Sequence, residues 1–187
     1  MPRPNWPVKD IAWCSHLKGK KPSEITQDML VAVTGGGKLE KCAAAAWEKM
    51  VAAAAADGIT LKATSAGDAF RSIAQQQAGF LARYTQKPIE GASTRRWDNK
   101  LWYLKKGQAP MAAPIDDPAG PKAAGSRHLY GIAIDVANAA AGDGKILAWL
   151  VANEERFGFS HEVLGDANGK GAEAWHIRYV AGDNPPA

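Results

Sequence analysis

Two short segments of the chain combine residue types that could hold a metal ion. SRHLYGIAID contains His128 and Asp135, and GAEAWHIRYV contains Glu173 and His176. Two imidazoles and one carboxylate form a reasonable three-ligand zinc site, with a further position open for water or substrate. A carboxylate beside such a site could accept a proton from attacking water during amide hydrolysis. His128, Asp135 and His176 are therefore candidate zinc ligands, and Glu173 is a candidate general base.

This interpretation requires a sharp turn between His128 and Asp135. In a straight strand the two residues would lie about 23 Å apart, at roughly 3.3 Å per residue, and could not share an ion. A turn near Leu129-Tyr130-Gly131 would fold His128 back toward the strand that follows. That strand would place Asp135 on one face and, on the other face, the apolar side chains of Ile132, Ile134 and Val136.

The second segment has the alternation of a half-buried strand. Ile177 and Tyr179 alternate with His176 and Arg178, so we expect Glu173 to lie in the turn before the strand. The same spacing is compatible with histidines that only form hydrogen bonds in the core or at the surface. Spacing alone leaves both interpretations open.

Length and composition indicate one globular domain. The chain has 187 residues, 46% of them hydrophobic, and no apolar run long enough to span a bilayer. We expect an N-terminal extension over residues 1–37, packed on or preceding the domain, and one domain over residues 38–187 that carries the candidate zinc site. The N-terminus lacks the apolar region of a secretory signal peptide, so another route would have to deliver the protein to an external substrate.

The net charge and the two cysteines say less about the function than the candidate zinc ligands do. A net charge of +4 and a pI near 9.1 favour adsorption to nucleic acid, teichoic acid or a carboxylate-rich cell wall, but ordinary surface charge explains them equally well. Cys14 and Cys42 are too few for a disulfide framework, and we expect unpaired structural thiols. His16 stands beside Cys14 in the manner of a metal pair, with no further residue in the sequence to support it.

Periodicity and breaker residues predict the remaining elements. Ala-rich sequence with a stop at Gly58 predicts a helix over Lys38–Asp57. The other expected helices cover Glu24–Val33, Ser72–Tyr84 and Gly144–Phe157, and the expected strands cover Ile59–Thr64, Leu129–Val136 and Trp175–Val180.

Two further segments have an unusual composition. Thr94–Lys106 interleaves aromatic with basic residues, which is compatible with single-stranded nucleic acid binding. It is also compatible with a loop or helix whose aromatic residues pack on the body, or with the wall of a substrate groove. Gln108–Gly125 is rich in Pro, Ala, Gly and Asp, and we expect a surface loop beside the candidate site that helps to shape a pocket.

Three ordered motifs resemble those of a known enzyme family. SRHLYGIAID is similar to the SxHxxGxAxD motif of the zinc D-alanyl-D-alanine carboxypeptidases and related L-alanyl-D-glutamate endopeptidases, the VanY-like enzymes. EAWH resembles their ExxH motif, and FRSIAQQ resembles their YRSxxxQ segment, with Phe70 in place of Tyr. The resemblance covers about the last two-thirds of the chain.

The resemblance implies a small α+β domain whose antiparallel sheet carries the metal. It implies Zn²⁺ ligands at His128, Asp135 and His176 and a catalytic base at Glu173. It further implies that Arg71 binds the substrate carboxylate or steadies the developing oxyanion, and it places Ser126 and Gln76 near the substrate. His161 falls where relatives often carry Trp, and we expect a surface histidine there, with a role beside the metal as the alternative.

The expected function is zinc-dependent hydrolysis of peptidoglycan stem peptides, by a carboxypeptidase or an endopeptidase. The Ala-rich helix and the segments SAGDAFRS and HIRYVAGDNPP also resemble peptidases of actinobacterial phages. This resemblance implies an endolysin, which reaches the host wall after holin-type release, or an enzyme carried by the virion. We expect a monomer without membrane insertion or specific nucleic acid. The alternatives are a non-catalytic cell-wall-binding or virion structural protein on the same fold, and a nucleic-acid-binding protein that uses Thr94–Lys106.

Overall fold

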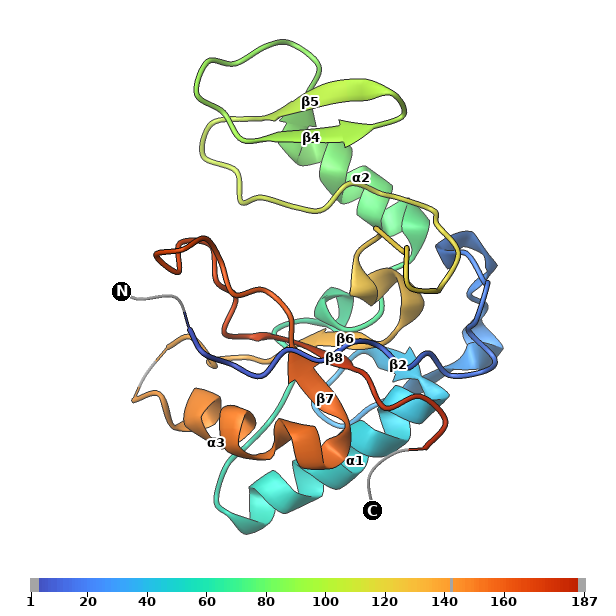
Figure 1. The fold of residues 1–187 in the computed structure, drawn as a ribbon, viewed down its shortest axis with the longest axis vertical. Helices are drawn as coiled ribbons and strands as arrows, with labels where there is room; N and C mark the ends of the chain where they lie inside the picture. Colours follow the sequence, from blue (N-terminus) through green and yellow to red (C-terminus); the bar gives the residue numbers. More distant parts are fainter. Residues whose placement is uncertain (1–3, 142, 185–187) are drawn as a thin grey trace.

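The computed structural model describes residues 4–141 and 143–184 and has the expected α+β architecture (Figure 1). The helices of the described chain are α1 (Lys41–Ala56), α2 (Ile73–Arg83) and α3 (Lys145–Asn153), and short 3-10 turns cover Pro22–Glu24, Gln27–Met29, Ala66–Asp68, Arg127–Tyr130 and Glu154–Phe157. The strands form three antiparallel sheets: β1 (Leu30–Ala32) with β2 (Lys38–Glu40); β3 (Tyr84–Thr85), β5 (Lys100–Leu104) and β4 (Thr94–Trp97); and β6 (Ala133–Asp135), β8 (His176–Tyr179) and β7 (Phe159–His161).

The third sheet forms the centre of the body. Strand β8 lies between β6 and β7, with Ile134 paired to Ile177 and Phe159 paired to Tyr179. These four side chains are buried in the main hydrophobic core. The opposite face of the sheet is therefore free to carry polar groups.

Helix α1 covers the core beside this sheet (Figure 1). Ala43, Trp47, Met50 and Ala54 follow one another at helical spacing and are fully buried. Glu40 caps the helix N-terminus by accepting hydrogen bonds from the amides of its first turn. The predicted helix therefore exists, but its first residues, Lys38–Glu40, form β2 instead, because they pair with β1.

The N-terminal segment shares the main core. Trp13, Leu17 and Val33 are buried among the residues of that core, and Ala12 forms a parallel bridge with Ala181. Residues 4–37 thus pack against both α1 and the C-terminal part of the described chain. The helix expected over Glu24–Val33 is wrong: two 3-10 turns and β1 occupy that segment.

Helix α2 and strands β3–β5 form a lobe above the body (Figure 1). Ser72 and Gln75 form a reciprocal capping box at the start of α2, as the predicted boundary requires. Phe80, Tyr84 and Trp102 belong to a second, smaller hydrophobic cluster. Phe80 stacks on Tyr84 with ring centroids 4.4 Å apart.

Three sequence-based expectations for extended segments need correction. Of the strand expected over Leu129–Val136, only Ala133–Asp135 forms β6, because Arg127–Tyr130 is a 3-10 turn. Thr94–Lys106 is mostly the β4–β5 hairpin, not a loop or a helix, and Asp98 and Asn99 supply the positive φ angles of its turn. Ile59–Thr64 forms no strand; Ala63 alone makes a bridge, to Val136. Among the described residues no helix combines the length and apolar character that crossing a membrane requires.

Candidate active site

Asp135, His176 and Glu162 place their polar side chains in a row on one face of the central sheet. Asp135 on β6 pairs directly with His176 on β8, and His161 on β7 pairs with Ile177. The residue after His161, Glu162, therefore comes opposite His176 on the other side. Side chains that face each other on neighbouring strands lie about 5 Å apart, so the register itself brings these polar groups together.

His128 reaches this row from the 3-10 turn Arg127–Tyr130. Gly131 ends the turn with a φ of +70°, and a Cβ there would lie 2.9 Å from the backbone nitrogen of Glu40. Both the left-handed backbone and the close approach require glycine. The predicted turn at Leu129–Gly131 is thereby confirmed, and it brings His128 back over β6.

Asp135 Oδ1 lies between one nitrogen of each histidine. It is 2.8 Å from Nδ1 of His176 and 3.3 Å from Nε2 of His128. The other ring nitrogens also meet oxygen atoms: Nδ1 of His128 lies 2.8 Å from the carbonyl of Ala69, and Nε2 of His176 lies 3.3 Å from Oε2 of Glu162. In each imidazole ring, one nitrogen therefore contacts a fixed oxygen atom and the other nitrogen faces Asp135.

This arrangement fits a metal ion. One ligand atom from each of His128, Asp135 and His176 lies within 4.8 Å of the other two. Metal-binding histidines commonly have their second nitrogen held by a carbonyl or carboxylate, as here. Two nitrogens and one oxygen are a donor set that zinc accepts, and a fourth position would remain for substrate or water.

The site strongly perturbs the ionisation of its members. Burial would raise the pKa of Asp135, but hydrogen bonds from His128 and His176 outweigh it and hold the pKa well below its usual range. Burial would lower the pKa of His176, but Asp135 and Glu162 raise it to about 9. Partial burial of Glu173 in the cavity raises the pKa of its carboxyl group. A raised pKa makes that carboxylate a stronger proton acceptor near neutral pH.

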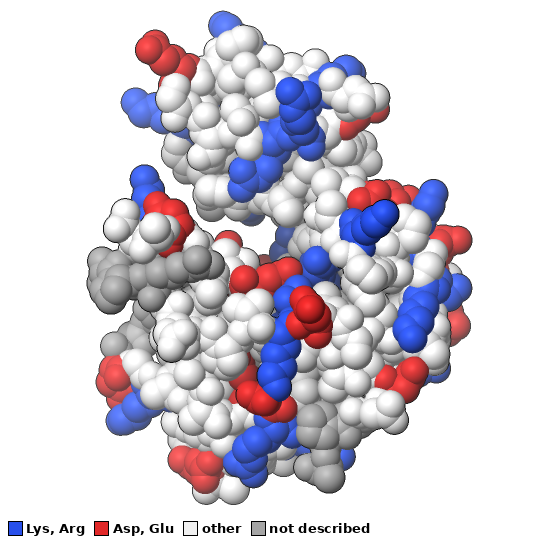
Figure 2. All heavy atoms as spheres, viewed as in Figure 1, with Lys and Arg blue, Asp and Glu red and all other residues white. Residues whose placement is uncertain are grey.

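A single cavity of about 720 Å³ contains all the residues predicted for the site. Its lining includes Arg71, Gln76, Ser126, His128, Asp135, Glu173 and His176. Arg83 and Arg95 contribute from the lobe, and Pro110–Ala112 and Ala123–Gly125 contribute from the predicted surface loop. Figure 2 shows the surface hollowed between the lobe and the body.

Arg71 is fixed by three neighbours. Its Nε donates to the carbonyl of Gly67 at 3.0 Å, its Nη1 donates to Oε1 of Gln76 at 2.8 Å, and its Nη2 lies 3.4 Å from Oδ1 of Asp68. Gln76 is itself fully buried and donates to the carbonyl of Ala112 at 2.7 Å. Both ends of the Gln76 amide are engaged, so Gln76 orients Arg71 toward the cavity.

Arg83, Arg95 and Arg127 line the cavity but were not predicted from the sequence, and neither was Glu162. Its Oε1 accepts from Nη1 of Arg178 at 2.8 Å and lies 3.4 Å from Nε of Arg127, while its Oε2 faces His176. The available signal was strand alternation: Phe159 is apolar, so in a strand Ser160 and Glu162 would lie on the face opposite to it.

The surface position expected for His161 is wrong. Its side chain is fully buried, with Nδ1 2.7 Å from Oε2 of Glu154 and Nε2 3.1 Å from the carbonyl of Ala174. The ring also lies 4.5 Å from that of Trp6. Through its contact with Ala174, His161 stabilises the turn before β8 from inside the core.

Most of the sequence matches one family model. Residues 36–182 match the model described as "VanY: D-alanyl-D-alanine carboxypeptidase". The chain belongs to this family. No curated protein matches it.

Solved structures of VanY proteins share the fold. VanYB in complex with D-alanine-D-alanine has a TM-score of 0.50 and 22% identity, over 81% of this chain and 76% of that one. A vancomycin-resistance D,D-pentapeptidase VanY from a VanB-type cassette, a point mutant in complex with Zn(II), has a TM-score of 0.50 and 20% identity, over 96% and 83%. The predicted zinc cofactor agrees with that neighbour and with the convergence of the three candidate ligands.

A third neighbour is the LdcB LD-carboxypeptidase, whose structure is described as revealing the basis of peptidoglycan recognition. It has a TM-score of 0.58 and 22% identity, over 88% of this chain and 75% of that one. At these identities the three neighbours show the fold, and the family assignment comes from the sequence match.

Proposed function

We propose that this member of the VanY family is a zinc-dependent peptidase that removes the terminal D-alanine from peptidoglycan stem peptides. The observation that carries the proposal is the position of Asp135 Oδ1 between His128 Nε2 and His176 Nδ1, in a cavity that also contains Glu173. These three atoms are the proposed zinc ligands. When bound, zinc polarises the scissile carbonyl and increases the acidity of water.

Glu173 is the proposed general base. It accepts a proton from the attacking water and passes that proton to the amine that leaves. Glu162 and the carbonyl of Ala69 hold His176 and His128 in the orientation that the ligand set requires.

Arg71 is the proposed binding group for negative charge in the substrate. Its guanidinium is preorganised by Gly67 and Gln76, so little reorganisation is needed when charge develops nearby. Arg83, Arg95 and Arg127 also line the cavity. The lining also holds four carboxylates, Asp68, Asp135, Glu162 and Glu173, so charge alone does not select the substrate. We prefer a carboxypeptidase to an endopeptidase because the matching family model is that of a D-alanyl-D-alanine carboxypeptidase.

Mass spectrometry of defined muropeptides tests this function. We expect the zinc-loaded protein to release one alanine from a pentapeptide stem, and His176→Ala to lose both the zinc ion of the cavity and cleavage. Separation of cross-linked dimers, or release of the stem after its first residue, would replace the carboxypeptidase with an endopeptidase. Binding of muropeptides by the zinc-loaded protein without any cleavage would favour a non-catalytic wall-binding protein.

We further propose that the enzyme acts in phage lysis, which the resemblance of its sequence style to actinobacterial phage peptidases supports. Expression inside a host should lyse the cells only when a membrane pore is formed at the same time. Lysis without a pore, or none with one, would argue against this setting.

A further inference from the structure

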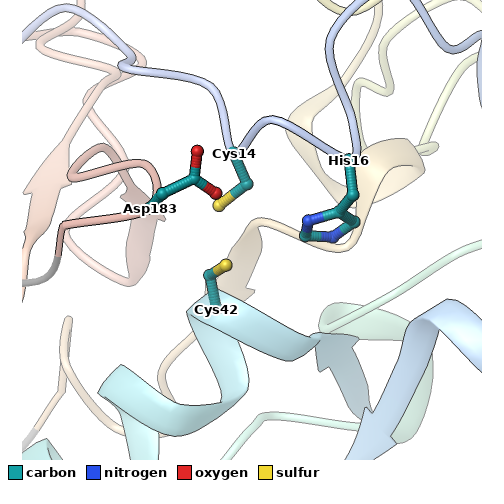
Figure 3. A group of neighbouring side chains, drawn as sticks. All are labelled: Cys14, His16, Cys42 and Asp183. Atoms are coloured by element: carbon teal, nitrogen blue, oxygen red, sulfur yellow. The ribbon is translucent and has the colours of Figure 1, made fainter.

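A second group of potential metal ligands lies outside the cavity. Cys14, His16, Cys42 and Asp183 each offer one ligand atom, and these four atoms all lie within 4.8 Å of one another. Figure 3 shows the side chains pointing toward a common space from three segments: the N-terminal loop, the start of α1 and the C-terminal turn. We propose that these residues form a structural zinc site, separate from the site in the cavity.

The donor types favour zinc over harder cations. Two thiolates and an imidazole are soft or borderline ligands, which select zinc over magnesium or calcium. A fourth ligand, Asp183, completes the tetrahedral set that is typical of structural zinc sites. In such a set the ligand atoms lie roughly 3.3–3.8 Å apart, so a small contraction of the observed group suffices.

The surrounding contacts hold the ligands in place. The backbone nitrogen of Ser15 donates to both oxygens of Asp183 at 3.0 Å, and its hydroxyl donates to Oδ1 at 3.2 Å. The thiol of Cys14 donates to Oε1 of Glu40 at 3.7 Å. Glu40 is fully buried and also caps α1, so it is a fixed carboxylate behind the group.

His16 has a buried nitrogen without a partner. Its Nε2 lies 3.0 Å from Oε2 of Glu40, but this contact lacks hydrogen-bond geometry, and the atom has no hydrogen-bond partner among the described residues. This nitrogen is therefore available to a cation, beside the Glu40 carboxylate. If the other ring nitrogen binds, Nε2 is placed for the carboxylate contact that zinc histidines commonly make.

The proposed ion would join three parts of the chain that are distant in sequence. Ala12 donates its backbone amide to the carbonyl of Val180 at 2.9 Å, so the N-terminal loop and the C-terminal turn already run side by side. Cys42 adds the first turn of α1. Zinc bound here would stabilise the folded state, because the ligands are separated when the chain unfolds.

Metal analysis of the full chain tests the proposal. We expect two zinc ions per chain in the protein saturated with zinc and then dialysed. His128→Ala should retain one ion, at the cysteine site, and the double variant Cys14→Ser with Cys42→Ser should retain one ion, in the cavity. One ion in the starting protein, absent from His128→Ala, would overturn the proposal.

Measurements on the unsubstituted protein keep the test valid if the double variant does not fold. The chain has two cysteines, so every thiol signal reports on this site. We expect zinc to protect both thiols from alkylation until a chelator is added, and Co²⁺ to produce a thiolate-to-metal charge-transfer band. Full alkylation in the presence of zinc, or a disulfide between Cys14 and Cys42, would contradict the site. Hydrolysis is not measured, so the outcome is independent of the proposed peptidase activity.

Discussion

Oε2 of Glu162 lies 3.3 Å from Nε2 of His176, on the side of the ring away from the nitrogen that meets Asp135. The contact fixes the ring orientation in which Nδ1 faces the candidate metal position. Arg178 and Arg127 hold Glu162 in turn. His176 is therefore supported by a charged network and not by a single contact.

Weakening this support should reduce zinc affinity. Glu162→Gln removes the negative charge while keeping a similar shape, and we expect zinc affinity to fall about 10- to 100-fold. Competition with a chromogenic chelator measures this, in a background that carries Cys14→Ser and Cys42→Ser so that the proposed second site does not contribute. Glu90→Gln, at an exposed position in the lobe, is the matched control and should bind zinc normally. Equal affinities for the two variants would show that Glu162 does not position the ligand.

Zinc affinity should also depend on pH. The pKa of His176 in the metal-free protein is raised from 6.5 to about 9, so a proton must leave before its nitrogen can bind metal. We expect the affinity to rise by up to about tenfold per pH unit between about pH 6 and about pH 9. Chelator competition across this range, corrected for the chelator's own protonation and made with the Cys14→Ser, Cys42→Ser variant, tests it. An affinity independent of pH would contradict a protonated His176.

The stability of the metal-free protein should change in the opposite direction. Because the folded-state pKa of His176 lies above its unfolded value, the protonated ring stabilises the fold below about pH 6.5. That stabilisation is lost as the pH rises through about 9. Urea unfolding of the chelated protein at several pH values, with His176→Gln as the comparison, isolates this contribution. A loss of equal size in the variant would assign it to another group.

Arg71 should contribute through its geometry as well as its charge. Arg71→Lys keeps the charge but loses the planar fork that contacts Gly67 and Gln76. We expect kcat/KM to fall roughly 10- to 100-fold, the effect of losing one charge-assisted hydrogen bond of about 1.5–3 kcal/mol. Arg156→Lys, at an exposed position, is the control. Unchanged kcat/KM in Arg71→Lys would remove Arg71 from substrate binding.

Local sequence signals predicted the geometry around the candidate metal ligands, whereas Arg71, Gln76 and Ser126 were assigned through the family resemblance. The turn at Gly131 and the alternation around Asp135 and His176 are short-range features, and the structure has both. The Ala-rich helix and its stop at Gly58 depend on propensity and on a left-handed glycine, and these were also predicted correctly.

The errors concern segments whose structure depends on distant partners. Leu30–Ala32 is a strand because it pairs with β2, a contact that periodicity within Glu24–Val33 does not reveal. His161 is buried because Glu154 and Trp6 cover it, and Glu162 joins the site because β7 pairs with β8. Tertiary pairing overrode local propensity in each case.

The measurement that tests the central claim most directly compares zinc content with muropeptide cleavage in Glu173→Gln. The variant keeps His128, Asp135 and His176, so it should bind zinc as the starting protein does. It lacks the proposed base, so turnover should fall about 10²- to 10⁴-fold, while Glu90→Gln stays unchanged. Near-normal turnover by zinc-loaded Glu173→Gln would contradict the account.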